Sequence, residues 1–225
     1  MKRSLGILCL GGLLLAGLPT TTAAQEMDIR DFVHQIYIEG MPYEAANAYD
    51  STAVPTLMEM LADSTEAPYW ANIAVVLCII GDPIYVDPLI DFIKADQGTL
   101  TDEIYRAKSS AIMALGYLIN KTGDENALNY LIESIDPGVW AQREVQYVGP
   151  YEASTEARDL NLSTMAMLGL ALSGRPEAME ALSRVTVPEG AVDDPLAGVA
   201  AAAREAHQQI AADGLVEYYR NQDNQ

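Results

Sequence analysis

The stretch AKSSAIMALGYLINKTGDENALNYLIES, residues 107–134, contains the pattern that decides the fold. Small and apolar residues with helical spacing come first, and a Gly-Asp turn interrupts them. A second segment with helical spacing begins directly after the turn. The stretch therefore predicts two helices joined by a tight turn.

The same arrangement recurs along the chain. Four segments align on a leucine: AVPTLMEML on Leu57, YVDPLIDFI on Leu89, ALNYLIESI on Leu131 and AMEALSRVT on Leu182. Glycine-containing turns at residues 81–83, 123–124 and 174–176 precede the last three of these segments. A helix pair that recurs in this way predicts a stack of pairs, because stacking buries the apolar stripe that each pair would otherwise expose.

Gly116 and Gly169 occupy the same place in the first helices of two pairs, and Cys78 falls there in the preceding pair. A glycine inside a helix costs about 1 kcal/mol relative to alanine. Its recurrence predicts a close crossing of helices, where a larger side chain would not fit.

The segments IIGDPIYVDPLIDFI, ALGYLINKTGDENALNYLIES and LGLALSGRPEAMEALSR resemble HEAT repeats, in particular the short bacterial kind also found in phycobilisome lyases. The anchor leucines lie 32, 42 and 51 residues apart, and their average of about 42 falls within the 40–47 residues that are typical of such units. The resemblance covers residues 43–214. It implies an all-α fold, a right-handed α-solenoid of about four to five antiparallel helix pairs, and a role in holding another macromolecule, with no universal catalytic residue.

We expect one HEAT-like domain over residues 25–220. Its expected parts are a capping segment at 25–42 with a helix at 28–39, helix pairs at 43–62, 68–95, 102–135 and 154–185, an inserted loop at 136–153, a Pro/Gly/Asp-containing loop at 188–195, and a fifth pair at 196–212 and 214–220. Residues 221–225 form a polar tail that we expect to fray.

The first 24 residues have the pattern of a cleaved signal peptide. Lys2 and Arg3 precede an apolar run over residues 5–18, and small residues at 22–24 suit a signal peptidase. The apolar run is shorter than the roughly 20 residues that a membrane span needs. We therefore expect an exported bacterial protein, periplasmic or secreted, whose mature chain starts at Gln25 and does not span a membrane.

Charge and cysteine content exclude several classes. The 225 residues contain 13 basic and 32 acidic side chains, a net charge of −19, which argues against a nucleic-acid binder. Removal of the signal peptide would leave Cys78 alone among apolar neighbours, which predicts a buried residue rather than a nucleophile.

No metal, cofactor or catalytic motif occurs, so we expect no enzyme activity, no cofactor and no metal. Asp82 and Asp124 are interpreted as helix N-caps, since Arg175 occupies the corresponding turn of a later pair.

The insert at 136–153 is one candidate binding surface. It carries aromatic side chains and an arginine, the residue types that dominate recognition surfaces: Trp140, Arg143, Tyr147 and Tyr151. The alternative is that Trp140 and Tyr147 fold back and cover an edge of the helix stack, since tryptophan is usually mostly buried.

The second helices provide another candidate. Positions two residues before or after the anchor leucines should form a ridge along one face, and five of them are acidic: Glu59, Asp87, Asp91, Glu133 and Glu180. We call these five residues the acidic ridge. The alternative is an ordinary solvated face of an acidic protein.

These features predict a non-catalytic scaffold that binds a protein or peptide, basic or of mixed charge. Two alternatives remain open: an accessory subunit or enzyme of the HEAT-containing lyase type, and a purely structural envelope protein.

Overall fold

A computed structural model describes residues 27–38, 40–185 and 195–223, and these residues are mostly helical. The predicted all-α class is confirmed. The expected signal peptide and residues 188–194 of the expected loop lie outside the described residues. Within the described ranges, no helix is both long enough and apolar enough to cross a bilayer.

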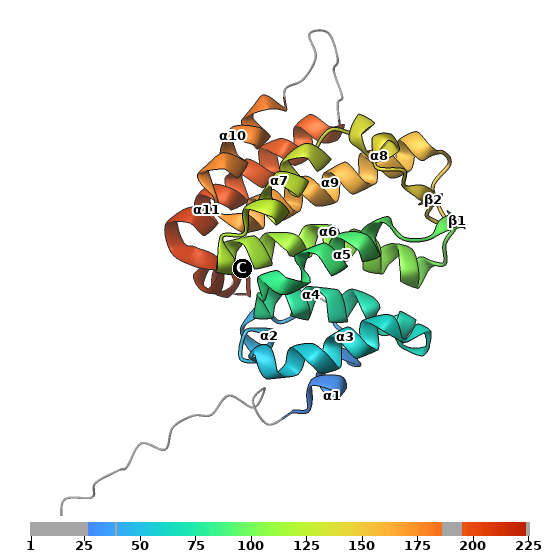
Figure 1. Ribbon diagram of the computed structural model, residues 1–225. Helices are drawn as coiled ribbons and strands as arrows, with labels where there is room; N and C mark the ends of the chain where they lie inside the picture. Colours follow the sequence, from blue (N-terminus) through green and yellow to red (C-terminus); the bar gives the residue numbers. More distant parts are fainter. Residues whose placement is uncertain (1–26, 39, 186–194, 224–225) are drawn as a thin grey trace, which may run out of the picture.

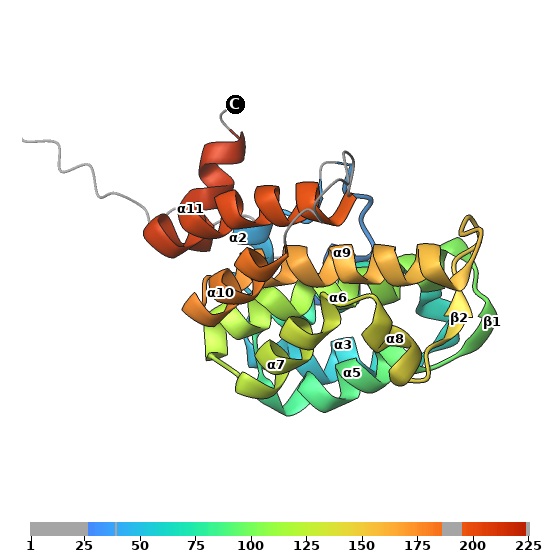
Figure 2. The same cartoon turned by 90° about the horizontal axis from the view of Figure 1, so that it is seen from above.

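The helices form two layers that follow the order of the chain (Figures 1 and 2). One layer contains α4 (Trp70–Ile80), α6 (Asp102–Thr122), α9 (Thr155–Ser173) and α11 (Pro195–Asp223). The other contains α3 (Val54–Ala62), α5 (Val86–Lys94), α7 (Glu125–Ser134) and α10 (Pro176–Arg184). Short elements complete the fold: α1 (Ile29–Val33), α2 (Tyr43–Ala46), α8 (Gly138–Gln142), and the 3₁₀ segments η2 (Ser51–Ala53), η3 (Ser64–Tyr69) and η4 (Pro83–Tyr85).

The predicted aspartate cap is found at α7, whereas Asp82 caps the short segment η4 that precedes α5. Gly81, Gly123 and Gly174 end α4, α6 and α9 in the left-handed conformation. The Asp124 carboxylate accepts a hydrogen bond from the backbone N–H of Ala127 and caps α7. Asp82 caps η4 in the same way, and its carboxylate accepts from the N–H of Ile84 at 3.1 Å.

The predicted close crossing is confirmed at α6 and α9. A Cβ atom placed on Gly116 would lie 2.1 Å from the carbonyl oxygen of Gly169, well inside any real contact. The two helices therefore meet backbone to backbone at these glycines. Cys78 is fully buried in α4, as expected for a small core residue.

The N-terminal part is less regular than predicted. The helix expected at 28–39 ends at Val33, and Ile36, which we expected on its apolar face, is 89% exposed. The apolar face that does form, Ile29, Phe32 and Val33, is buried. In the expected pair at 43–62, the first helix is reduced to the four residues of α2.

The insert at 136–153 contains structure that the sequence did not predict. It forms α8 and strand β2 (Gln146–Val148), which pairs in parallel with strand β1 (Gln97–Thr99) between α5 and α6. The register pairs Gln97 with Gln146, Gly98 with Tyr147 and Thr99 with Val148. The insert is therefore attached to the loop that joins α5 to α6, between two successive helix pairs.

The last helix returns to the beginning of the stack. Helix α11 is broken at Gly214, and its final section brings Tyr219 against Tyr43 of α2, with ring centroids 5.1 Å apart. Arg220 forms an ion pair with Glu44 at 2.5 Å. The tail that we expected to fray from residue 221 is helical as far as Asp223.

Candidate functional site

The two large rings of the insert lie in the core. Trp140 and Tyr147 are both fully buried. The indole N–H of Trp140 donates to Ser163 Oγ at 3.0 Å, and the Tyr147 hydroxyl donates to the carbonyl oxygen of Ile93 at 2.9 Å. The alternative that Trp140 and Tyr147 fold back onto the helix stack is therefore correct. Neither ring is accessible as an anchor for a partner.

Two buried cationic side chains lie against the insert, Arg158 of α9 and Lys108 of α6. Arg158 donates to the carbonyl oxygens of Val145 and Tyr147, both at 2.8 Å, and is only 2% exposed. Lys108 is fully buried and pairs with Asp96 at 3.0 Å. Burial lowers the pKa of Lys108, whereas the Asp96 carboxylate acts to raise it. The Lys108 ammonium group also lies 5.3 Å from the centre of the Tyr147 ring, so both buried cations contact the insert.

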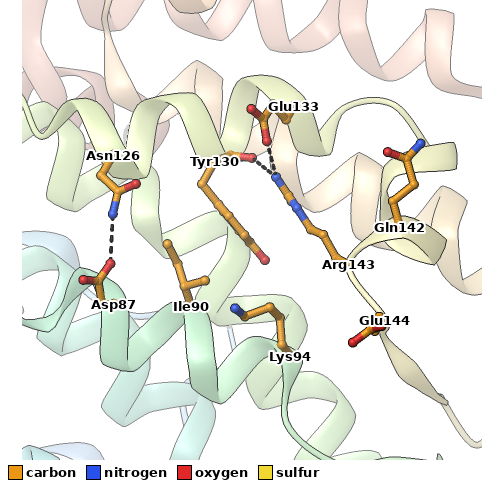
Figure 3. A pocket seen from close by; sticks show the side chains of 9 residues that line it. All are labelled: Asp87, Ile90, Lys94, Asn126, Tyr130, Glu133, Gln142, Arg143 and Glu144. Atoms are coloured by element: carbon orange, nitrogen blue, oxygen red, sulfur yellow. Dashed lines mark hydrogen bonds and ion pairs between the residues drawn. The ribbon is translucent and has the colours of Figure 1, made fainter.

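An open groove lies where the insert meets the second-helix layer (Figure 3). Its volume is about 360 Å³. Residues from α5, α7, α8 and the two positions after α8 line it: Asp87, Ile90, Lys94, Asn126, Tyr130, Glu133, Gln142, Arg143 and Glu144. The groove thus brings together two residues of the acidic ridge, Asp87 and Glu133, and three residues of the insert, of which Arg143 is the predicted candidate.

Arg143 forms one wall of the groove through several contacts. Its guanidinium carbon lies 4.0 Å from the centre of the Tyr130 ring, a cation–π distance. One terminal nitrogen pairs with Glu133 at 3.0 Å and donates to the carbonyl oxygen of Tyr130 at 3.2 Å. The other nitrogen donates to Ser134 Oγ. The predicted candidate Arg143 is therefore at the site, but most of its hydrogen-bonding capacity is already used.

Tyr130 is aromatic and is the most buried of the six lining residues that the sequence analysis did not single out. Its ring reaches from α7 toward α5 and is 8% exposed (Figure 3). Its hydroxyl oxygen is buried and has no hydrogen-bond partner. Burial raises the pKa of Tyr130 to about 12 against the opposing charge of Arg143, so the hydroxyl stays protonated and able to donate. The position directly before the anchor leucine holds Thr56, Pro88 and Ala181 in the other segments, so the large ring was a detectable signal.

The remaining candidates lie outside the groove. Glu59 pairs with Arg30 at 3.0 Å, Asp91 with Lys94 at 3.3 Å, and Glu180 with Arg184 at 2.5 Å. Exposed ion pairs of this kind contribute about 0–1 kcal/mol each. Tyr151 is exposed and does not line the groove. The acidic ridge therefore separates into two groove residues and three residues in local surface pairs.

In the part of the chain that the structure describes, no three His, Cys, Asp or Glu side chains are grouped so that they could hold a metal ion. Burial raises the pKa of the Cys78 thiol, which opposes formation of the nucleophilic thiolate.

Comparison of the chain with protein-family models, with curated proteins and with solved structures gave no match.

Proposed function

We propose that the protein is an exported, HEAT-like scaffold that binds another protein without catalysing a reaction. The proposal includes a right-handed solenoid of four to five antiparallel helix pairs, in which α3, α5, α7 and α10 are the second helices. Export rests on the signal pattern of residues 1–24, and mass analysis of the N-terminus would test it. A mature chain beginning at Gln25 is expected, whereas a retained Met1 in a membrane fraction would contradict export.

The observation that carries the proposal is the groove between α5, α7 and α8. It places acidic and basic side chains around a tyrosine ring, beside an insert whose backbone is hydrogen-bonded to the buried Arg158. Its polar lining and openness suit a polypeptide segment better than a small apolar ligand, which usually occupies an enclosed, mostly apolar cavity. The acidic excess of the chain favours a partner that is basic or of mixed charge.

Capture of partners from a periplasmic extract tests this function. The double variant Asp87→Lys/Glu144→Lys changes two carboxylates that line the groove. The control Glu59→Lys/Glu180→Lys makes the same change of charge at two ridge residues outside it. We expect the wild-type protein and the control to retain a stoichiometric protein partner and the groove variant to lose it. Absence of any stoichiometric partner, or its loss only from the control, would contradict the proposal.

A further inference from the structure

The Tyr130 hydroxyl is an unusual feature of the groove. Most buried polar groups in proteins have a hydrogen-bond partner, and leaving one unpaired costs about 1–3 kcal/mol. Within the described residues, three buried side chains have an unpaired polar atom, Ser109, Tyr130 and His207, and of these Tyr130 lines the groove. The hydroxyl oxygen is buried in the free protein, so it can donate a hydrogen bond to a bound molecule once the end of the ring moves into the groove.

Lys94 is the second donor available at the centre of the groove. Figure 3 shows the Tyr130 ring pointing toward the part of α5 that carries Lys94. The ammonium group pairs with Asp91 three residues earlier on the same helix, at 3.3 Å. Such an exposed pair is weak, so the Lys94 ammonium group can leave Asp91 and pair with another anion. Arg143 beside them adds positive charge, although its donors are engaged.

Two carboxylates lie on opposite sides of this centre. Figure 3 shows Asp87 on one side and Glu144 on the other. Asp87 accepts one hydrogen bond from Asn126 at 2.9 Å, and Glu144 is exposed. Together with Glu133, the lining holds three acids and two bases, which leaves a net charge of −1.

We propose that the groove binds an extended peptide segment in which an acidic residue lies between two basic residues. The central carboxylate accepts hydrogen bonds from the Tyr130 hydroxyl and the Lys94 ammonium group, while the flanking cations pair with Asp87 and Glu144. Alternate residues of an extended chain project to the same side, so a Lys-x-Glu-x-Lys order presents all three charges to the groove. This inference rests on the proposed function and specifies the partner of the same site.

Two peptides of identical composition test the order of charges. The first is acetyl-Ala-Lys-Ala-Glu-Ala-Lys-Ala-amide, and the second has the order Lys-Ala-Lys-Ala-Glu between the same ends. Both have the same net charge, so general attraction to an acidic protein affects them equally. In NMR titrations of the purified protein, we expect the first peptide to bind at least about threefold more tightly and to shift signals of α5, α7 and α8.

Tyr130→Phe separates binding from folding. It removes a hydroxyl that has no partner in the free protein, so the melting temperature should remain unchanged or rise. Affinity for the first peptide should fall by about tenfold, because a hydrogen bond to a charged group is lost. Lys94→Gln should also weaken the first peptide more than the second.

Three results would overturn the inference: equal affinity for the two peptides, no detectable binding of either, or an unchanged affinity of Tyr130→Phe for the first peptide. These results are distinct from failure of the proposed function. A protein partner that is captured equally by wild-type protein and Tyr130→Phe would leave the scaffold function intact and would exclude this mode of recognition.

Discussion

Gly116 and Gly169 show how single residues determine the distance between two neighbouring helices, α6 and α9. The carbonyl oxygen of Gly169 occupies the space where a side chain on residue 116 would begin. Backbone atoms cannot move aside as the end of a flexible side chain can. The absence of a side chain at these two positions is therefore what permits α6 and α9 to pack so closely.

Gly116→Ala should destabilise the protein by about 1–3 kcal/mol, because the added methyl group forces α6 away from α9. Denaturant unfolding measures the change. Gly198→Ala in α11 is the matched control, since no atom lies within 4 Å of its added Cβ. It should stabilise the protein by up to about 1 kcal/mol through helix propensity. Equal effects of the two substitutions would show that the crossing is not tightly packed.

Cys78 should be inert toward thiol reagents in the folded protein. Its side chain is buried, and burial raises the thiol pKa above the value of about 8.5 expected in the unfolded chain. Its contribution to stability is therefore complete below pH 8.5 and declines as the pH rises further. Peptide mass spectrometry after alkylation should detect modification of Cys78 only in denaturant. Rapid labelling under native conditions would contradict the burial.

Among the elements, the long helices were the easiest to predict and the insert the hardest. The regions of α4–α7, α9 and α10 follow from helical spacing and glycine turns, which are local signals. The pairing of Gln97–Thr99 with Gln146–Val148 joins two three-residue strands from distant parts of the chain, too short to show alternation. The groove was only partly predictable for the same reason, since Tyr130, Lys94 and Glu144 come together only after the insert has folded onto the stack.

Arg158→Met should loosen the insert. The substitution leaves the carbonyl oxygens of Val145 and Tyr147 without their buried donor, at a cost of about 1–3 kcal/mol for each unpaired group. Hydrogen exchange should become faster at residues 97–100 and 145–148. Arg184→Met, which breaks only an exposed pair with Glu180, should change neither exchange nor stability appreciably. Unchanged exchange in Arg158→Met would mean that the strand pair holds the insert without Arg158.

At the scale of the whole molecule, buried tyrosines connect elements that are distant in the sequence. Tyr117 of α6 and Tyr219 of α11 share a hydrogen bond between their hydroxyls, and the Tyr105 hydroxyl donates to Glu152 of the insert. Burial is the largest cause that raises the pKa of each of these three phenols. Several long-range contacts therefore depend on phenols that must remain protonated.

Alkaline pH should unfold the protein cooperatively. In the folded state the pKa of Tyr37, Tyr130 and Tyr219 is raised to about 12, against about 10 in the unfolded chain. Their contribution to stability is complete below pH 10 and is lost between about pH 10 and 12. Tyrosinate absorbance and loss of helical circular dichroism should therefore change together. Tyr130→Phe should move the midpoint to higher pH, and full ionisation with the helices intact would contradict the prediction.

The return of α11 to α2 changes how the stack can come apart. In an open array the outermost member has a single neighbour, so it frays first and the loss spreads inward one unit at a time. Here α2 contacts both α4 and the final section of α11, through the stacked rings of Tyr43 and Tyr219 and the pair between Arg220 and Glu44. The C-terminal extremity is therefore no loose end, because its release should also free α2, whereas α1 and α3 at the other extremity pack only against their own neighbours.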